Sequence, residues 1–177
     1  MNDELIRFQE INGQYQSWRL LYRASRDGFS SESFHEGCNG ESNTLTVIQS
    51  ANSKVFGGFT GASWSKSDGF KEDPYAFIFT LLNDQSRQKV LKCTEPLNAI
   101  YCNQNYGPCF GNDDIKISNM SNTNQNSSST VGFSYGEGIV KYGSNESKTL
   151  LAGEQNFQVV EVEVFTKNYI KLNEVHY

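Results

Sequence analysis

The stretch Thr44–Thr60, TLTVIQSANSKVFGGFT, predicts a β-hairpin. Two runs rich in β-branched and aromatic residues, Leu45–Ile48 and Val55–Phe59, flank a turn-forming cluster of serine, alanine and asparagine. Because apolar residues are adjacent within each run, they point to both faces of the sheet, and the hairpin must be covered on both sides. Gly57 and Gly58 have no side chain to pack, which indicates a bulge or a second backbone close by.

Other segments of the chain have the composition of strands. They are residues 18–24, 75–82, 90–93, 97–102, 113–118 and 157–166. The run 75–82 (YAFIFTLL) is almost continuously apolar, which predicts a central strand, and residues 105–111 (NYGPCFG) are typical of a turn. Since most separations have hairpin length, the sequence predicts a mostly β fold with a minor α component. The expected architecture is a two-layer antiparallel β-sandwich flanked by a few short helices.

The segment 157–166 (FQVVEVEVFT) alternates valine with glutamate. Val160, Val162 and Val164 share one face of the predicted strand. Glu161 and Glu163 share the other face, so we expect a dry side and a wet side. Glu161 and Glu163, together with Glu154, are our candidates for contacting a partner. A carboxylate pair can also perform acid/base catalysis, but neighbouring glutamates on an exposed strand are usually solvated.

A short helix is predicted after the first strand. Ser30 is placed to cap its N-terminus, Phe29 and Phe34 are spaced as a hydrophobic staple, and Gly28 belongs to the preceding turn. Glycines and an asparagine at 37–40 end the helix.

We expect one domain over residues 1–177, because neither an internal repeat nor a linker is visible. Its parts are a core at about 18–166, an N-terminal helix or arm at 1–16 and a loosely attached tail at 167–177.

Three internal segments are expected to lack regular structure. Residues 62–74 form a loop anchored by the ring of Trp64, and residues 131–151 are irregular. Residues 119–130 (NMSNTNQNSSST) have almost no apolar group to bury, so we expect a mobile surface loop.

The composition limits where the chain can be located and which partners it can bind. A net charge of −5 and a pI of about 5.1 argue against general binding to nucleic acids. The N-terminus does not have the pattern of a signal peptide, and no apolar run is long enough to cross a membrane. We therefore expect a cytoplasmic protein without membrane insertion, whose four cysteines remain thiols.

Three stretches in order, WRLLYRASRDGFSSESFHEGC from Trp18, TLTVIQSANSKVFGGFTGASWS from Thr44 and LAGEQNFQVVEVEVF from Leu151, together resemble the TLDc domain family. The resemblance covers about residues 18–165 and implies a β-sandwich flanked by short helices. The residues that match the family pattern as structural positions are Gly28, Phe29, Phe34, Phe56, Gly57, Gly58, Trp64, Gly153 and Phe157.

The resemblance also implies a function. Members of the family are associated with protection against oxidative damage and with binding or regulating the vacuolar proton-pumping ATPase, and the family supplies no established catalytic residues. Our preferred hypothesis is therefore a non-enzymatic protein-interaction domain that needs neither a cofactor nor a metal.

Two alternatives stay open. An uncharacterised hydrolase or peroxide-consuming enzyme would use His35 and Cys38, which lie on adjacent faces of the predicted helix, where the imidazole would lower the pKa of the thiol. A stress-responsive DNA-binding protein is the other alternative, against which the net charge argues. A divalent cation needs several oxygen donors that converge on it. Asp113 and Asp114 are one adjacent pair, so we expect a turn there rather than a metal site.

Overall fold

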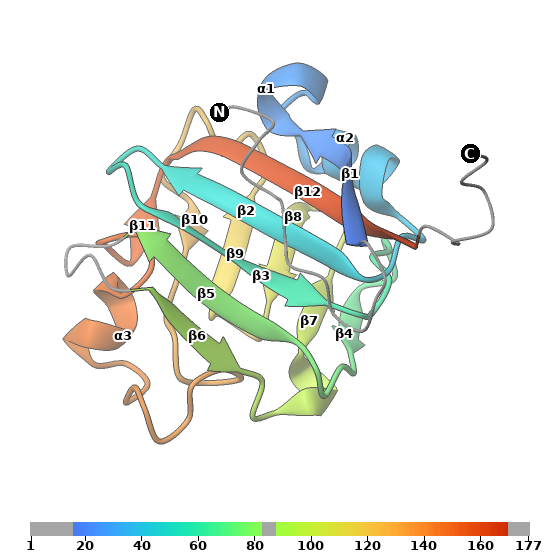
Figure 1. Cartoon of the computed structure of the whole chain (residues 1–177). Coiled ribbons are helices and arrows are strands. Elements are labelled where there is room, and N and C mark those ends of the chain that lie inside the picture. The colour runs from blue at the N-terminus through green and yellow to red at the C-terminus, as the bar shows by residue number, and fades with distance from the viewer. Residues whose placement is uncertain (1–15, 83–87, 170–177) are drawn as a thin grey trace, which may run out of the picture.

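Two antiparallel sheets packed face to face form the body of the protein (Figure 1). The computed structural model describes residues 16–82 and 88–169, and the elements below are those of these residues. The first sheet has the spatial order β1 (Gln16–Arg23), β12 (Val159–Tyr169), β2 (Thr44–Ser50), β3 (Val55–Thr60), β5 (Phe77–Leu82) and β6 (Lys89–Lys92). The second has the order β11 (Asn156–Phe157), β10 (Ser127–Ser128), β9 (Ile115–Ser118), β8 (Tyr106–Phe110), β7 (Ile100–Cys102) and β4 (Gly69–Lys71). The predicted fold class is thus confirmed.

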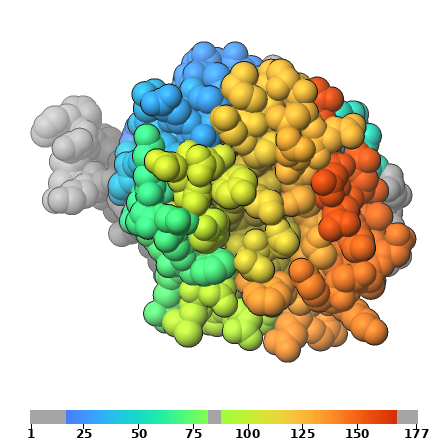
Figure 2. Space-filling view, turned by 180° about the vertical axis from the view of Figure 1, so that it is seen from behind, coloured from blue at the N-terminus to red at the C-terminus, as the bar shows by residue number. Residues whose placement is uncertain are grey.

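Short helices flank the sheets. They are α1 (Ala24–Asp27), α2 (Ser31–Cys38), the 3₁₀ helix η1 (Pro96–Asn98) and α3 (Asn145–Thr149). The second of them, α2, lies against β1 and β8 and so joins the two sheets at one end of the sandwich. Figure 2 shows the opposite side of the molecule from Figure 1.

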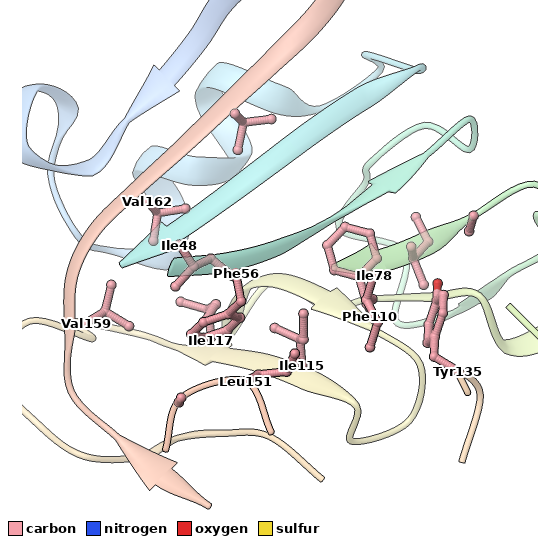
Figure 3. Packing of buried hydrophobic residues seen from close by; sticks show 14 of the residues in the cluster. Ile48, Phe56, Ile78, Phe110, Ile115, Ile117, Tyr135, Leu151, Val159 and Val162 are labelled. Atoms are coloured by element: carbon pink, nitrogen blue, oxygen red, sulfur yellow. The ribbon is translucent and has the colours of Figure 1, made fainter. Parts of the chain in front are cut away.

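The core lies between the sheets (Figure 3). Ile48, Phe56 and Ile78 of the first sheet point toward Phe110 and Ile115 of the second, and all five side chains are fully buried. Large aromatic rings pack around these five side chains, as expected where aromatic pairs meet edge to face. Stability therefore depends on tight packing between strands that are distant in the sequence.

The predicted hairpin is present as β2 and β3, which pair in register from Thr44 and Thr60 at the open end. Both glycines allow close approach. A Cβ atom on Gly57 would overlap the carbonyl oxygen of Thr46, and one on Gly58 would lie 2.6 Å from the ring of Phe110 in the other sheet. The second contact explains why β3 has no side chain where it faces the ring of Phe110.

The hairpin also carries apolar groups on its outward face. Phe165, Leu45, Phe59 and Phe77 are paired in one row across β12, β2, β3 and β5. The rings of Phe59 and Phe77 stack with centroids 5.3 Å apart. The prediction that both faces of the hairpin carry apolar side chains is confirmed.

The helix α2 begins as predicted. The Ser30 hydroxyl accepts a hydrogen bond from the backbone N–H of Ser33 at 3.0 Å. Phe34 is buried, Phe29 packs against the same core, and the helix ends at Cys38. A local capping pattern therefore set the boundaries of this helix correctly.

Several predicted boundaries on the second sheet were wrong. Residues 105–111 are not a turn, because Tyr106–Phe110 form β8 in the middle of the sheet. The predicted strand 97–102 is divided between η1 and the shorter β7, and residues 62–74 include the strand β4. Proline and glycine in a strand are read locally as turn signals, but here a register shift in the pairing of β8 with β9 accommodates them.

The serine-rich segment 119–130 was wrongly predicted as a mobile surface loop. It contains β10, and Ser121, Ser127 and Ser129 are buried. The Ser129 hydroxyl donates to the carbonyl oxygen of Asp114 at 2.9 Å. Hydrogen bonding thus orders a segment that has little apolar surface to bury.

The closing strand β12 differs from its prediction in two respects. A register shift between Val159 and Glu161 places Val160 at the surface, so it does not share the dry face. Glu163 is buried rather than wet, since only 7% of it is exposed. The apolar run 75–82 becomes β5, which is next to the edge strand β6 rather than central.

The proposed N-terminal helix or arm and most of the proposed tail lie outside the described residues. Gln16 already belongs to β1, and β12 continues to Tyr169, beyond the predicted end of the core. Within residues 16–82 and 88–169, no helix is long and apolar enough to cross a membrane.

Candidate functional site

A buried carboxylate organises the loop that follows β10. Asp114 accepts hydrogen bonds from the backbone N–H groups of Gly132, Phe133, Ser134 and Tyr135 at 3.0, 3.2, 2.9 and 3.3 Å. Burial raises the pKa of Asp114 to about 6, and the four amide donors oppose that rise because they favour the ionised form. Four consecutive amides thus fix the start of the loop to one side chain.

Two glycines make this arrangement possible. Gly111 has a φ of 65°, and a Cβ atom there would overlap the carboxylate of Asp114. Gly132 has a φ of 110°, and its Cβ would lie 2.6 Å from the carbonyl oxygen of Val140. Any other residue at either position would therefore be strained and would displace the loop.

The same loop presents large apolar side chains to solvent. The exposed fractions are 42% for Phe133, 64% for Ile139 and 46% for Tyr142. The rings of Phe133 and Tyr142 meet edge to face with centroids 5.8 Å apart. We call these three side chains the 131–143 surface. Apolar groups held at the surface by an ordered backbone are characteristic of a recognition site.

His35, one of the two proposed catalytic residues, is buried in α2. Its Nδ1 lies 2.8 Å from Oδ1 of Asn39, and its Nε2 lies 3.0 Å from the carbonyl oxygen of Asn103. Both ring nitrogens are thus engaged in joining α2 to the loop after β7. A general base needs a free nitrogen that faces its substrate, which this arrangement does not offer.

Cys38, the other proposed catalytic residue, is fully buried. Burial raises the pKa of its thiol above the ordinary value, and the negative charges of Glu41 and Asp27 add to the rise. The environment therefore favours an inert thiol, in contrast to the lowered pKa that a nucleophile needs.

The three glutamates proposed as partner contacts occupy different environments. Glu163 is buried, and its Oε1 accepts a hydrogen bond from Nε of Arg23 at 2.7 Å. Glu161 accepts from the backbone N–H of Ser25 at 3.0 Å, and the half-buried Glu154 accepts from Asn52 at 2.6 Å. Glu163 lies beside β1, Glu161 lies beside α1, and Glu154 lies at the hairpin turn.

The adjacent aspartates do not converge. Asp113 pairs with Nζ of Lys116 at 3.0 Å, whereas Asp114 points inward to the loop amides. Within the described ranges, no group of three or more histidine, cysteine, aspartate or glutamate side chains is arranged to hold a metal ion.

A shallow, open depression of about 400 Å³ lies between α1 and α2. It is lined by Leu21, Arg26, Asp27, Ser33, Glu36 and Gly37. Arg26 and Asp27 are paired with each other at 2.7 Å. Unlike a typical ligand pocket, the depression has few apolar walls and does not enclose its occupant.

A comparison with known protein families shows to which family the chain belongs. A family model described as the TLDc domain matches residues 3–168. The chain belongs to the TLDc family. The resemblance inferred from three sequence stretches is thereby confirmed, and the match extends over nearly the whole chain.

The family-type residues of this TLDc domain serve its packing and its turns. Trp64 is buried and donates from Nε1 to the Thr44 hydroxyl at 2.9 Å, and the rings of Phe56 and Phe157 meet edge to face at 5.4 Å. Gly28 and Gly153 adopt positive φ values of 108° and 83°. Each of these residues thus has a role in packing or in a turn.

Sequence reasoning missed the 131–143 surface and the role of Asp114 within this TLDc domain. One signal was available, since residues 131–143 (VGFSYGEGIVKYG) alternate glycines with large apolar residues. Such a pattern predicts an irregular, ordered loop rather than a strand or a helix. That the loop amides converge on one carboxylate required the structure.

Proposed function

We propose that this TLDc domain is a non-enzymatic protein-interaction domain of the cytoplasm, which takes part in protection against oxidative stress by binding the vacuolar proton-pumping ATPase. Membership of the family supports an interaction role. The link to the ATPase and to oxidative stress comes from the resemblance alone.

One geometric observation carries the non-enzymatic part of this proposal. The residues that the sequence suggested for catalysis make separate structural contacts. His35 bonds with Asn39 and Asn103, and Glu163 bonds with Arg23. An enzyme needs a nucleophile and a base that converge on one accessible point. The exposed side chains of the 131–143 surface, by contrast, are available to a partner.

A binding assay tests the proposal. The purified full chain is immobilised and exposed to the peripheral sector of the vacuolar ATPase, with an unrelated β-sandwich of similar net charge as the control bait. We expect the TLDc domain to retain the ATPase sector and the control bait not to retain it. Reproducible absence of retention, with an intact fold by circular dichroism, would count against the ATPase as its partner.

A further inference from the structure

The outward face of the first sheet carries a continuous apolar row that no described helix covers. The row consists of side chains paired directly across five neighbouring strands, namely Leu20, Phe165, Leu45, Phe59 and Phe77. We call these five side chains the outer row. Figure 1 looks onto this face, and among the elements of residues 16–82 and 88–169 no helix lies in front of β2, β3 and β5. A sheet that is apolar on both faces needs a covering layer on each.

The aromatic side chains of this face pack against one another. The rings of Phe59 and Phe77 stack at 5.3 Å, and Phe79 follows on the same face of β5 with its ring 6.4 Å from that of Phe77. Only 9% of Leu45 and 7% of Phe79 is exposed, and the other members of the outer row are half-buried. A contiguous group of large apolar side chains on an outward face marks a site of contact.

The chain enters the first sheet at the end where the outer row lies. Gln16 pairs with Tyr169, and Leu20 of the outer row follows in the same strand. From β1 to β5 the sheet crosses β12, β2 and β3, a distance of about 19 Å at the usual strand spacing. A helix over residues 3–12 would be about 15 Å long, and residues 13–15 would add up to about 10 Å. The segment that precedes β1 is therefore long enough to cross the outer row.

The segment that precedes β1 has the sequence pattern of an amphipathic helix. At about 3.6 residues per turn, Leu5, Phe8 and Ile11 lie within about 120° on one side of such a helix. We call these three residues the apolar stripe. Ile6 points about 160° away from Phe8. Three of the four charged residues between positions 3 and 12 also lie outside the stripe, namely Asp3, Arg7 and Glu10. A stripe of this kind needs an apolar face to pack against.

We propose that residues 3–15 of the chain dock on the outer row, with the apolar stripe packed against Leu45, Phe59 and Phe77. The segment forms a further layer on the first sheet, opposite the layer that the second sheet provides. While it is docked, it closes this face to other proteins. The assignment goes beyond the proposed interaction function and does not depend on the identity of the partner.

Photo-crosslinking in the full chain tests the docking. The photoreactive amino acid benzoylphenylalanine replaces Phe8 in one variant, and it replaces Glu10, on the other side of the helix, in the control variant. We expect irradiation to link position 8 to peptides of β2, β3 or β5 of the same molecule about fivefold more often than position 10. Mass spectrometry identifies the linked peptides.

Other crosslinking results would overturn the proposal. Equal yields from positions 8 and 10, or links from position 8 to other parts of the chain, would mean that the apolar stripe does not face the outer row. Links between two molecules would show that a second copy of the chain covers the row instead.

A pair of isomeric side chains tests whether the docking stabilises the fold. Leu5→Ser removes apolar area from the stripe, and Ile6→Ser removes a similar area from outside it. We expect the first substitution to lower the thermal midpoint by about 3 °C or more and the second by less than about 1 °C. Equal changes in the two variants, including no change in either, would contradict a docked stripe.

Discussion

Arg23 Nε donates a hydrogen bond to Glu163 Oε1 at 2.7 Å and so joins the first strand to the last. The two residues are 140 positions apart in the sequence. These residues are also paired in the register of β1 with β12. Only 9% of the Glu163 side chain is exposed, against 30% of the Arg23 side chain. A carboxylate this deeply buried is destabilising unless a donor of opposite charge lies beside it.

Glu163→Ala is expected to lower the free energy of unfolding by about 1–3 kcal/mol, because it leaves a half-buried guanidinium without this acceptor. Chemical denaturation measures the change. Glu154→Ala is the control and should have an effect within about 0.5 kcal/mol, since the hydrogen bond that it removes lies at the surface. Equal small effects of both substitutions would contradict a structural role for Glu163.

The approach of Gly58 to Phe110 across the two sheets predicts the effect of a single methyl group. Gly58→Ala would place a Cβ atom 2.6 Å from Phe110, whose ring is fixed in the core. We expect a loss of about 1–3 kcal/mol in the free energy of unfolding, as for other overpacked cores. Gly69→Ala in β4 is the control, because its Cβ would meet nothing within 4 Å. If the two variants unfold alike, the layers are not in contact at Gly58.

Thiol labelling distinguishes the cysteines by burial. Cys93 is half-buried, whereas Cys38 and Cys109 are fully buried, and burial raises the pKa of both buried thiols. We expect a thiol-specific reagent at pH 8 to modify Cys93 first, and Cys38 only after unfolding. Mass spectrometry of peptides identifies the modified residue, and Cys93→Ser should abolish the first phase. Rapid native labelling of Cys38 would revive the hypothesis of a catalytic thiol.

Local signals predicted the elements that depend on neighbours in sequence. The hairpin of β2 and β3 follows from two β-branched runs and a turn, and the start of α2 follows from the Ser30 cap. Both involve hydrogen bonds between residues close along the chain, which composition and spacing can indicate.

Signals of this kind failed where distant strands decide the structure. Residues 106–110 contain proline and glycine and yet form a strand, because β7 and β9 pair with them on either side. Glu163 was predicted to be wet because its partner, Arg23, lies in the first strand. Burial of a charged residue depends on which residue the fold brings opposite to it, and alternation in one strand does not contain that information.

The candidate site shows the same division. Large apolar residues in a glycine-rich segment were visible in the sequence, but neither their exposure nor the side chain that supports the loop was. Asp114 lies eighteen positions before the first of the amides that it binds, at Gly132. The separation between a loop and the side chain that orders it is set by tertiary structure, so no short motif marks it.

Asp114 gives the protein a dependence on pH with a defined sign. Its pKa is raised by burial from 3.8 to about 6, so the folded state holds the proton more tightly than the unfolded state. The contribution of this group to stability is therefore greatest below pH 4 and decreases by about 3 kcal/mol as the pH rises through 6. Asp114→Asn should remove this decrease, while Asp113→Asn, at a half-buried ion pair with Lys116, should retain it. Denaturation between pH 4 and 7 measures the difference between wild type and variant. A difference that changes in the opposite direction would mean that the four amides, rather than burial, control the ionisation of Asp114.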